Sequence, residues 1–306
     1  MQMGIRKYDF RSESESEKRD YVALCERDFD KQLSDAVDAI EKSGKRIITL
    51  SGPTCSGKTT TARRFIERLE RSGKKTGVIS IDDYYYARMY LEMRAEEKGI
   101  PVDFDSVNTI DLEYLSFCIR RLLIGESFKV PQFDFASGFR NGYVRFYPKK
   151  YDYYLFEGIQ AVYPEITSLF DGQNISVHIS VMNDIEVNGV PFEAREVRLM
   201  RRLVRDFKYR AAPPEHTFYM WKGVCDNEDK HITPYRDSAE VKIDSFLPYE
   251  PFMVRSELMS LLEKMPEGEY SAQAKNLYEK SGRLFDIDKR YLPDSSFFHE
   301  FMDDPK

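Results

Sequence analysis

The residues with the clearest chemical meaning form one octapeptide in the first fifth of the chain. It reads Gly52-Pro53-Thr54-Cys55-Ser56-Gly57-Lys58-Thr59 and matches G-x-x-x-x-G-K-[ST] at every fixed position. Glycine permits backbone angles that let such a loop turn its N–H groups inward around a phosphate, and the helix that continues at Thr60 adds the positive end of its dipole. Lys58 can reach the β- and γ-phosphates, and the Thr59 hydroxyl can ligate Mg²⁺. The motif predicts a bound nucleoside triphosphate with magnesium.

The segments on either side of the loop support this interpretation. Residues 46–51 read as a buried strand, and after the loop apolar residues recur at helical spacing until Gly73, a typical helix stop. These apolar residues are Ala62, Phe65, Ile66 and Leu69. A chance match in a Gly/Ser-rich turn would not combine a strand before it with a helix after it, which is the setting that the motif requires.

The rest of the chain alternates strands with helices. We expect further strands at 76–81, 151–156, 175–181 and 239–245, and helices at 110–123, 193–208 and 251–264. The alternation predicts an α/β fold with a mostly parallel central sheet and helices on both faces. Ligands bind beyond the carboxyl ends of the strands in such sheets, so the loop, Asp82 and Glu157 would meet at one edge.

Two carboxylates at that edge suit phosphoryl transfer, which needs magnesium and an oriented acceptor hydroxyl. Asp82 could accept or orient the acceptor proton, with Asp83 as its competitor. Glu157 could hold magnesium directly or through water, and Asp82 also lies within reach of that role. The alternatives are an aspartate that caps a turn and a solvated loop acid.

Four arginines share one face of the predicted helix 193–208. They occupy positions i, i+3, i+4 and i+7 and are Arg198, Arg201, Arg202 and Arg205. An apolar set at the same spacing lies nearly opposite and comprises Met200, Leu203, Val204 and Phe207. We expect the apolar side to pack inward and the guanidiniums to face phosphate, which arginine binds bidentately. The alternative is a solvated basic face.

Two further features have open interpretations. The stretch 131–142 mixes Phe133, Phe135, glycines and Arg140, so it could stack on a flat base or be an ordinary hairpin with core aromatics. Cys55 lies inside the phosphate loop, where a helix N-terminus lowers a thiol pKa and oxidation could block the site. We favour the simpler reading, that this position only requires a small residue.

Composition bounds the class of protein. Of 306 residues, 42% are hydrophobic and 32% charged, with a net charge of −6, which is typical of a globular domain and gives no argument for nucleic-acid binding. The four cysteines and four histidines show no metal-ligand spacing. No apolar run approaches a membrane span and residues 1–20 lack a signal-peptide core, so we expect a cytoplasmic protein without membrane contact.

Before the core we expect a polar arm over residues 1–18, disordered at 12–17, and a helix that ends near Gly44. The proposed division is 1–44 for arm and helix, 45–252 for the catalytic core and 253–306 for a C-terminal helix and tail.

The combined pattern resembles the uridine kinase and phosphoribulokinase group of P-loop kinases over residues 46–252. It looks closest to uridine kinase-like nucleoside kinases that in many bacteria follow a threonyl-tRNA synthetase-like domain. Besides the loop, the similarity runs through 81–85, 104–105, 131–140, 156–159 and 198–206, through Trp221, Ile232, Pro234 and Ala239, and through 292–301. It implies a P-loop kinase fold with a helical lid at about 198–235 and a C-terminal appendage.

The resemblance also implies roles for single residues. Asp82 corresponds to the aspartate that activates a nucleoside 5′-hydroxyl, Asp105 to an acid on the ribose hydroxyls and Arg198 to an arginine on the same sugar. Thr59 and Glu157 correspond to groups near Mg²⁺. Arg201 would join Lys58 in neutralising charge during transfer. Arg205 would contact the donor, and Tyr85, Phe133, Phe135 and Arg140 would line the acceptor pocket.

The sequence departs from that group in the acceptor region. Uridine–cytidine kinases read the pyrimidine with a Tyr and a His, and the matching residues here are Phe133 and Gly138. Losing these hydrogen-bonding groups relaxes or redirects the choice of base. The insertion 183–192 could shape the acceptor pocket, and the synthetase-like domain has no counterpart in residues 1–44.

The sequence therefore predicts an ATP- and Mg²⁺-dependent kinase that phosphorylates the 5′-hydroxyl of a nucleoside, with the base undetermined. One alternative is a kinase of another small hydroxyl compound, such as a sugar phosphate or a pantothenate-like molecule. Another is a nucleotide-binding regulator without catalysis. We expect a small-molecule partner and no nucleic acid, and the sequence leaves open whether the chain forms a homo-oligomer.

Overall fold

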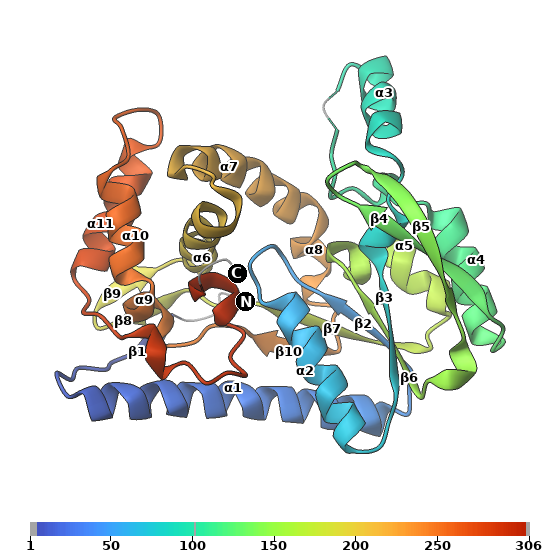
Figure 1. Cartoon of the computed structure of the whole chain (residues 1–306), viewed down its shortest axis with the longest axis horizontal. Coiled ribbons are helices and arrows are strands. Elements are labelled where there is room, and N and C mark those ends of the chain that lie inside the picture. The colour runs from blue at the N-terminus through green and yellow to red at the C-terminus, as the bar shows by residue number, and fades with distance from the viewer. Residues whose placement is uncertain (1–4, 101, 304–306) are drawn as a thin grey trace.

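A five-stranded parallel sheet forms the centre of the molecule (Figure 1). The computed structural model describes residues 5–100 and 102–303. The strand order is β10 (Val241–Asp244), β7 (Asn174–Ser180), β2 (Ile47–Ser51), β6 (Tyr153–Glu157) and β3 (Thr76–Ser80), and every neighbouring pair is parallel. The predicted α/β fold is confirmed, and all five predicted strands lie within two residues of their expected bounds.

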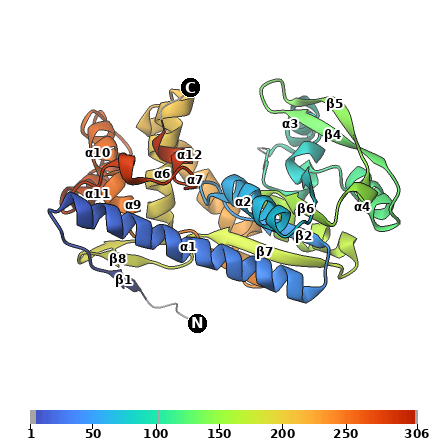
Figure 2. The ribbon, with the colours of Figure 1, turned by 60° about the horizontal axis from the view of Figure 1, so that its bottom comes forward.

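Successive side chains along each strand point to opposite faces of the sheet, and helices cover both faces. Ile48 packs with α1 (Glu15–Ser43) and α2 (Lys58–Arg71), whereas Ile47 packs with α4 (Leu112–Leu123) and the residues around α5 (Pro164–Thr167). Figure 2 shows α1 and α2 in front of the sheet. Because both faces are covered, even polar strand residues such as Thr49 and His178 are buried.

The N-terminal segment is ordered, so the predicted disorder at 12–17 is wrong. Ser14 caps α1 by accepting a hydrogen bond from the Glu17 backbone, and glutamates in the first turn suit the positive end of the helix. Ahead of it, the Phe10 ring stacks on Tyr21 at 4.0 Å. The alternating Ser and Glu therefore form a helix start, and α1 ends before Gly44 in the left-handed conformation, as expected.

A second small sheet corrects the interpretation of the insertion. Strands β8 (Ile185–Val187) and β9 (Val190–Phe192) form a hairpin whose first strand pairs in parallel with β1 (Arg6–Tyr8). The apolar residues of this hairpin join the core shared with α1. The insertion thus holds the N-terminal segment and does not line an acceptor pocket.

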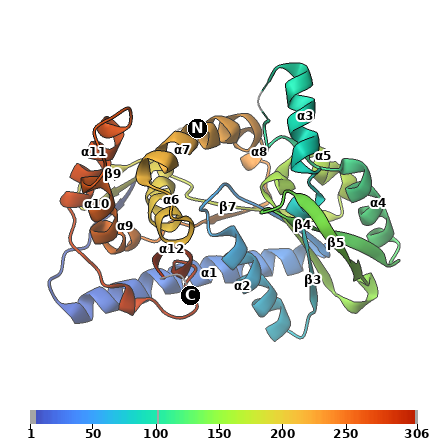
Figure 3. The same cartoon turned by 45° about the horizontal axis from the view of Figure 1, so that its top comes forward.

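Two groups of elements flank the phosphate loop (Figures 1 and 3). On one side lies α6 (Ala194–Arg210), and α7 (Pro214–His231) runs from there past the loop to α8 (Thr233–Arg236), whose Tyr235 packs against Tyr163. On the other lie α3 (Arg88–Lys98) and the antiparallel hairpin of β4 (Phe128–Asp134) and β5 (Phe139–Phe146). The carboxyl edge of the sheet therefore lies between α6 and the β4–β5 hairpin, with α7 running from one side toward the other.

The C-terminal part is helical. The predicted helix 251–264 is two helices, α9 (Glu250–Met253) and α10 (Arg255–Glu263), and they are followed by α11 (Ser271–Gly282) and α12 (His299–Met302). Their apolar residues belong to the same cluster as α1 and β2. Among the helices of residues 5–100 and 102–303, none is long and apolar enough to cross a membrane.

Candidate active site

The phosphate loop connects β2 to α2 and has the predicted strand–loop–helix setting. Its two glycines serve different purposes. Gly57 has a φ of +82°, which favours glycine, whereas a Cβ at Gly52 would lie 2.4 Å from the carbonyl oxygen of Ile179. Cys55 also takes a positive φ of +58°. Gly57 is therefore needed for its backbone conformation, and Gly52 is needed because the loop passes close to β7.

Lys58 and Glu157 meet beside the loop. The Lys58 Nζ lies 3.9 Å from Glu157 Oε2, and Ser80 Oγ donates a 2.8 Å hydrogen bond to Glu157 Oε1. Thr59 is exposed on the first turn of α2. No group of three or more His, Cys, Asp or Glu side chains able to hold a metal occurs within the described part of the chain. Magnesium bound by one or two protein groups and by phosphate oxygens needs no such group.

Asp82 lies in a single 3₁₀ turn, Ile81–Tyr84, directly after β3. Its Oδ1 is buried and has no hydrogen-bond partner among the described residues. Burial raises the pKa of Asp82 to about 6, against the opposing effect of the Lys58 charge. Asp83 is the weaker candidate because its Oδ1 accepts a 2.9 Å hydrogen bond from the Phe133 backbone. The unpaired Asp82 oxygen fits a group that awaits a proton or a metal.

The loop that contains Asp105 is fixed on two sides. Tyr163 donates a 3.0 Å hydrogen bond to the Asp105 carbonyl, and Asn227 of α7 hydrogen-bonds the Asp105 carboxylate. Burial nevertheless raises the pKa of Asp105. Two residues earlier, Asp103 accepts 2.8 Å contacts from both Lys230 and His231. Sequence reasoning missed Asn227, because its partner lies over a hundred residues away.

Aromatic side chains, among them Tyr86, build a cavity of about 430 Å³ whose wall residue Tyr85 lies in the field of Asp82 and Asp105. Tyr85 forms its inner wall: its hydroxyl donates to the Phe104 carbonyl at 2.9 Å and accepts from Gln160 at 2.7 Å. The other apolar walls are Leu91, Phe104, Phe133 and Phe135, and Arg88 and Glu92 of α3 also line the space. Gln160 was not predicted as a site residue. Its position just after the strand end at Glu157-Gly158 could have indicated it, because site residues follow strand ends in such sheets.

Arg140, which we expected in the acceptor pocket, does not line this cavity. Its guanidinium forms a 3.0 Å salt bridge with Asp111 and donates to the Tyr84 carbonyl at 2.8 Å. These bonds hold β5 against α4. Arg88 is the arginine that reaches the cavity, where it donates a 2.8 Å hydrogen bond to the Phe135 carbonyl.

The four arginines expected on one face of α6 are paired, contrary to the expected free guanidiniums; Arg198, Arg201 and Arg202 are buried and Arg205 is half-buried. Arg198 binds Glu228 at 2.6 Å and donates to the Thr54 carbonyl at 3.3 Å. Arg202 and Arg205 both pair with Asp206. The reason is that α7 covers this face, with Trp221 beside Arg198 and Arg202. On the opposite side Met200, Leu203 and Val204 are buried as predicted, but Phe207 is 49% exposed.

Arg201 cannot contact a phosphate in this arrangement, because all five of its N–H groups are used. It binds both carboxylate oxygens of Glu250, at 2.6 and 2.8 Å, and donates to the Ser245 carbonyl, the Ser245 hydroxyl and the Cys55 carbonyl. Both charged side chains are at most 2% exposed. The structure therefore gives Arg201 a role in holding the phosphate loop, in place of the expected charge on the moving phosphoryl.

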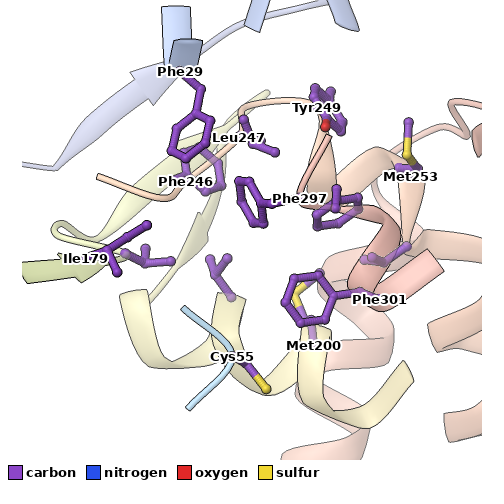
Figure 4. Packing of buried hydrophobic residues seen from close by; sticks show 14 of the residues in the cluster. Phe29, Cys55, Ile179, Met200, Phe246, Leu247, Tyr249, Met253, Phe297 and Phe301 are labelled. Carbon is purple, nitrogen blue, oxygen red and sulfur yellow. The ribbon is translucent and has the colours of Figure 1, made fainter. Parts of the chain in front are cut away.

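The C-terminal tail covers the outside of the loop. A Cβ at Gly57 would lie 2.8 Å from the Phe297 ring, and the rings of Phe297 and Phe301 lie 5.4 and 5.5 Å from the Arg201 guanidinium. Figure 4 shows both rings inside one apolar cluster. The Glu300 carboxyl is largely buried in the field of Arg205, Arg201 and Lys58.

This packing also bears on Cys55. The thiol is buried in the same cluster, and burial raises its pKa, with the charges of Arg205 and Arg202 opposing. A buried thiol of raised pKa is a poor target for oxidation, so the structure favours the simpler reading of this residue.

A phosphate loop at the carboxyl edge of a parallel sheet, with buried carboxylates beside its lysine, defines a P-loop phosphotransferase. The sequence profile described as "Phosphoribulokinase / Uridine kinase family" matches residues 47–248, and the chain belongs to that family.

Two relatives and one solved structure are similar to this chain. A uridine kinase of Halobacterium salinarum is 27% identical over 225 residues, which cover 73% of this chain and 88% of the relative. Uridine-cytidine kinase B of Dictyostelium discoideum is 28% identical over 204 residues, or 64% of this chain and 73% of the relative. Among solved structures, a D-glycerate 3-kinase from Cryptococcus neoformans has a TM-score of 0.44 at 12% identity and covers 72% of this chain and 88% of its own.

The Arg201–Glu250 pair gives a stability prediction. Glu250→Ala would leave the Arg201 charge buried without its partner, so we expect the free energy of unfolding to fall by about 3–5 kcal/mol in urea denaturation. Glu279→Ala removes an exposed carboxylate that lies 3.8 Å from Lys275 and should change it by less than about 0.5 kcal/mol. Equal effects of the two substitutions would contradict the assigned role.

The raised pKa of Asp82 gives a prediction that depends on pH. Above about pH 6 the carboxylate is ionised in both folded and unfolded chains, so its burial destabilises the fold; below that the folded chain takes up a proton and the penalty fades. Asp82→Asn should therefore stabilise the protein at pH 8, by up to about 3 kcal/mol, and much less at pH 4.5. Thermal unfolding of both proteins at the two pH values measures this, and a gain independent of pH would argue against it.

Proposed function

We propose that the protein is an ATP- and Mg²⁺-dependent kinase that transfers the γ-phosphoryl group to the 5′-hydroxyl of a nucleoside. The observation that carries the proposal is the unpaired, buried oxygen of Asp82, which shares one edge of the sheet with Lys58, Glu157 and Asp105. In this proposal Asp82 would lie between the groups that bind the donor and those that bind the acceptor. Membership of the family and the named relatives support kinase chemistry on a small hydroxyl compound.

In the proposed reaction, the acceptor hydroxyl attacks the γ-phosphorus while Asp82 takes its proton. A bond forms between the 5′-oxygen and phosphorus, the bond to the β-phosphate oxygen breaks, and ADP leaves. Lys58 and the loop N–H groups balance the charge on the phosphates. Thr59 and Glu157, with Asp82, would hold the magnesium ion, which neutralises the leaving phosphate when bound.

The acceptor sugar would lie against Asp105, whose carboxylate can accept from ribose hydroxyls while Asn227 steadies it. Arg198 is placed in α6 with its guanidinium on Glu228, so contact with the sugar requires that α7 moves. We propose that α7 and α8 are the moving part of the lid and that α6 stays in place, because Arg201 holds α6 to Glu250 and to the phosphate loop. Ala211, at a φ of +49°, lies in the turn between α6 and α7 and would be the hinge. Closing this lid would exclude water from the phosphates and suppress ATP hydrolysis.

Two other functions remain as outcomes of the experiment. A kinase of a sugar phosphate or a pantothenate-like acceptor would use the same donor side with a different pocket. A nucleotide-binding regulator would not need the unpaired Asp82 beside Asp105. The aromatic cavity next to Tyr85 favours an acceptor that carries a flat ring.

The test measures ADP release from ATP with and without a panel of nucleosides, sugar phosphates and pantothenate. We expect release that depends on a nucleoside and a 5′-monophosphate as product. Release with another acceptor only, or tight ATP binding without release, would replace the proposal by the corresponding alternative.

Asp82→Asn should lower kcat by about 10²–10⁴-fold with nucleotide binding retained, because the loop that binds ATP is unchanged. Calorimetric titration with an ATP analogue measures binding, and the Asp83→Asn variant serves as the neighbouring control. Near-normal turnover by Asp82→Asn would refute its role as the base.

A further inference from the structure

The aromatic cavity has charged groups on only one of its walls. Arg88 and Glu92 stand one turn apart on α3, at i and i+4, and both line the cavity. The remaining walls include Phe133, which offers a ring face but no hydrogen bond, and Tyr85, whose hydroxyl is already bonded to Phe104 and Gln160. Tyr86 also lines the cavity, with its ring 5.3 Å from that of Tyr90. A flat ring held between these aromatic groups would meet the charged hydrogen-bonding groups on α3.

Arg88 occupies the space that Gly138 leaves open. A Cβ at Gly138 would lie 2.9 Å from the Arg88 Cβ, so a larger residue there would displace this side chain. The Arg88 backbone donates to the Gly138 carbonyl at 2.8 Å, and its Nη2 donates to the Phe135 carbonyl at 2.8 Å. The start of α3 is thereby fixed to the hairpin turn. Nε and Nη1 of Arg88 have no partner among the residues described here, so they remain free to donate.

The two side chains have complementary hydrogen-bonding character. A guanidinium only donates and a carboxylate only accepts, so the pair fits a ring edge that presents an acceptor beside a donor. A carbonyl next to a ring N–H is such an edge. A ring N–H flanked by a carbonyl is also a more acidic donor than an exocyclic amino group, which favours a bond to a carboxylate.

We propose that Arg88 and Glu92 select the acceptor base, with Arg88 donating to a ring carbonyl and Glu92 accepting from the adjacent ring N–H. The acceptor is then a nucleoside with a lactam-type edge, as uracil, hypoxanthine and guanine present. This inference rests on the proposed nucleoside kinase activity and names the substrate class and the residues that choose it. Binding of the ring would take both charges, now exposed, out of bulk water and so strengthen each bond.

The test removes each partner of the proposed hydrogen bond separately. Methylation removes the ring N–H of the nucleoside, and Glu92→Ala removes the carboxylate that would accept from it. Uridine is compared with 3-methyluridine and inosine with 1-methylinosine, in the wild-type protein and in Glu92→Ala. In the wild type, methylation should lower kcat/KM by about 10–100-fold. In Glu92→Ala the unmethylated substrate should already be poor, and methylation should cost less than about threefold.

Matched variants on the same helix control for indirect effects. Arg94→Ala and Glu96→Ala remove the same residue types from exposed positions of α3 that do not line the cavity, so kcat/KM should stay within about twofold of wild type. Arg88→Ala should raise the acceptor KM about 10–100-fold with the KM for ATP unchanged, and Arg88→Lys should recover part of the loss. Thermal unfolding shows whether each variant is folded.

The outcomes separate this inference from the proposed function. If nucleosides are phosphorylated but methylation lowers kcat/KM by the same factor in the wild type and in Glu92→Ala, the inference is overturned. The proposed kinase activity then still stands. A preference for cytidine or adenosine over the lactam nucleosides also overturns it. If no nucleoside accepts phosphate from the wild type, the proposed function fails and the inference fails with it.

Discussion

The buried ion pair between Arg201 and Glu250 is the interaction on which the donor side depends. It joins α6 to α9, and through further hydrogen bonds from the same guanidinium it fixes the end of β10 at Ser245 and the phosphate loop at the Cys55 carbonyl. Two charges in an apolar interior are stable only when their hydrogen bonds are complete, and here they are. The loop therefore has its position set by a side chain that lies outside its own motif.

On the acceptor side the governing constraint is the crowding of negative charge. Burial raises the pKa of Asp82, and the charges of Glu157, Asp83 and Asp105 raise it further against the opposing charge of Lys58. Burial and Asp103 raise the pKa of Asp105, which Asn227, His231 and Lys58 oppose. Such a site is unfavourable for the fold, and in the proposed reaction it would suit the binding of magnesium and the removal of a proton. The strands make the arrangement unavoidable, because β3 and β6 are neighbours and both end at this edge.

The sequence predicted the sheet, the loop and the strand-end carboxylates because each has a local signal: apolar runs, a spaced motif, or an acid directly after a strand. It did not predict the fate of Arg198 or Arg201, since their partners Glu228 and Glu250 lie 30 and 49 residues away and carry no mark of pairing. The same holds for Arg88, whose contact with Gly138 depends on how the hairpin folds back onto α3. The sequence pattern located the helices and strands. Whether a given charged side chain faces solvent or pairs with another residue could be seen only in the packed structure.

The contact between Phe297 and Gly57 has a consequence for how the protein is made. A ribosome synthesises the phosphate loop early, and at roughly 5–20 residues per second the ring that backs it emerges on the order of tens of seconds later. Until then Arg201 lacks the aromatic rings on either side of it, and the apolar surface around Cys55 is uncovered. In the nascent chain the phosphate loop would therefore lack the aromatic packing behind it. That packing would form only once α12 has been synthesised.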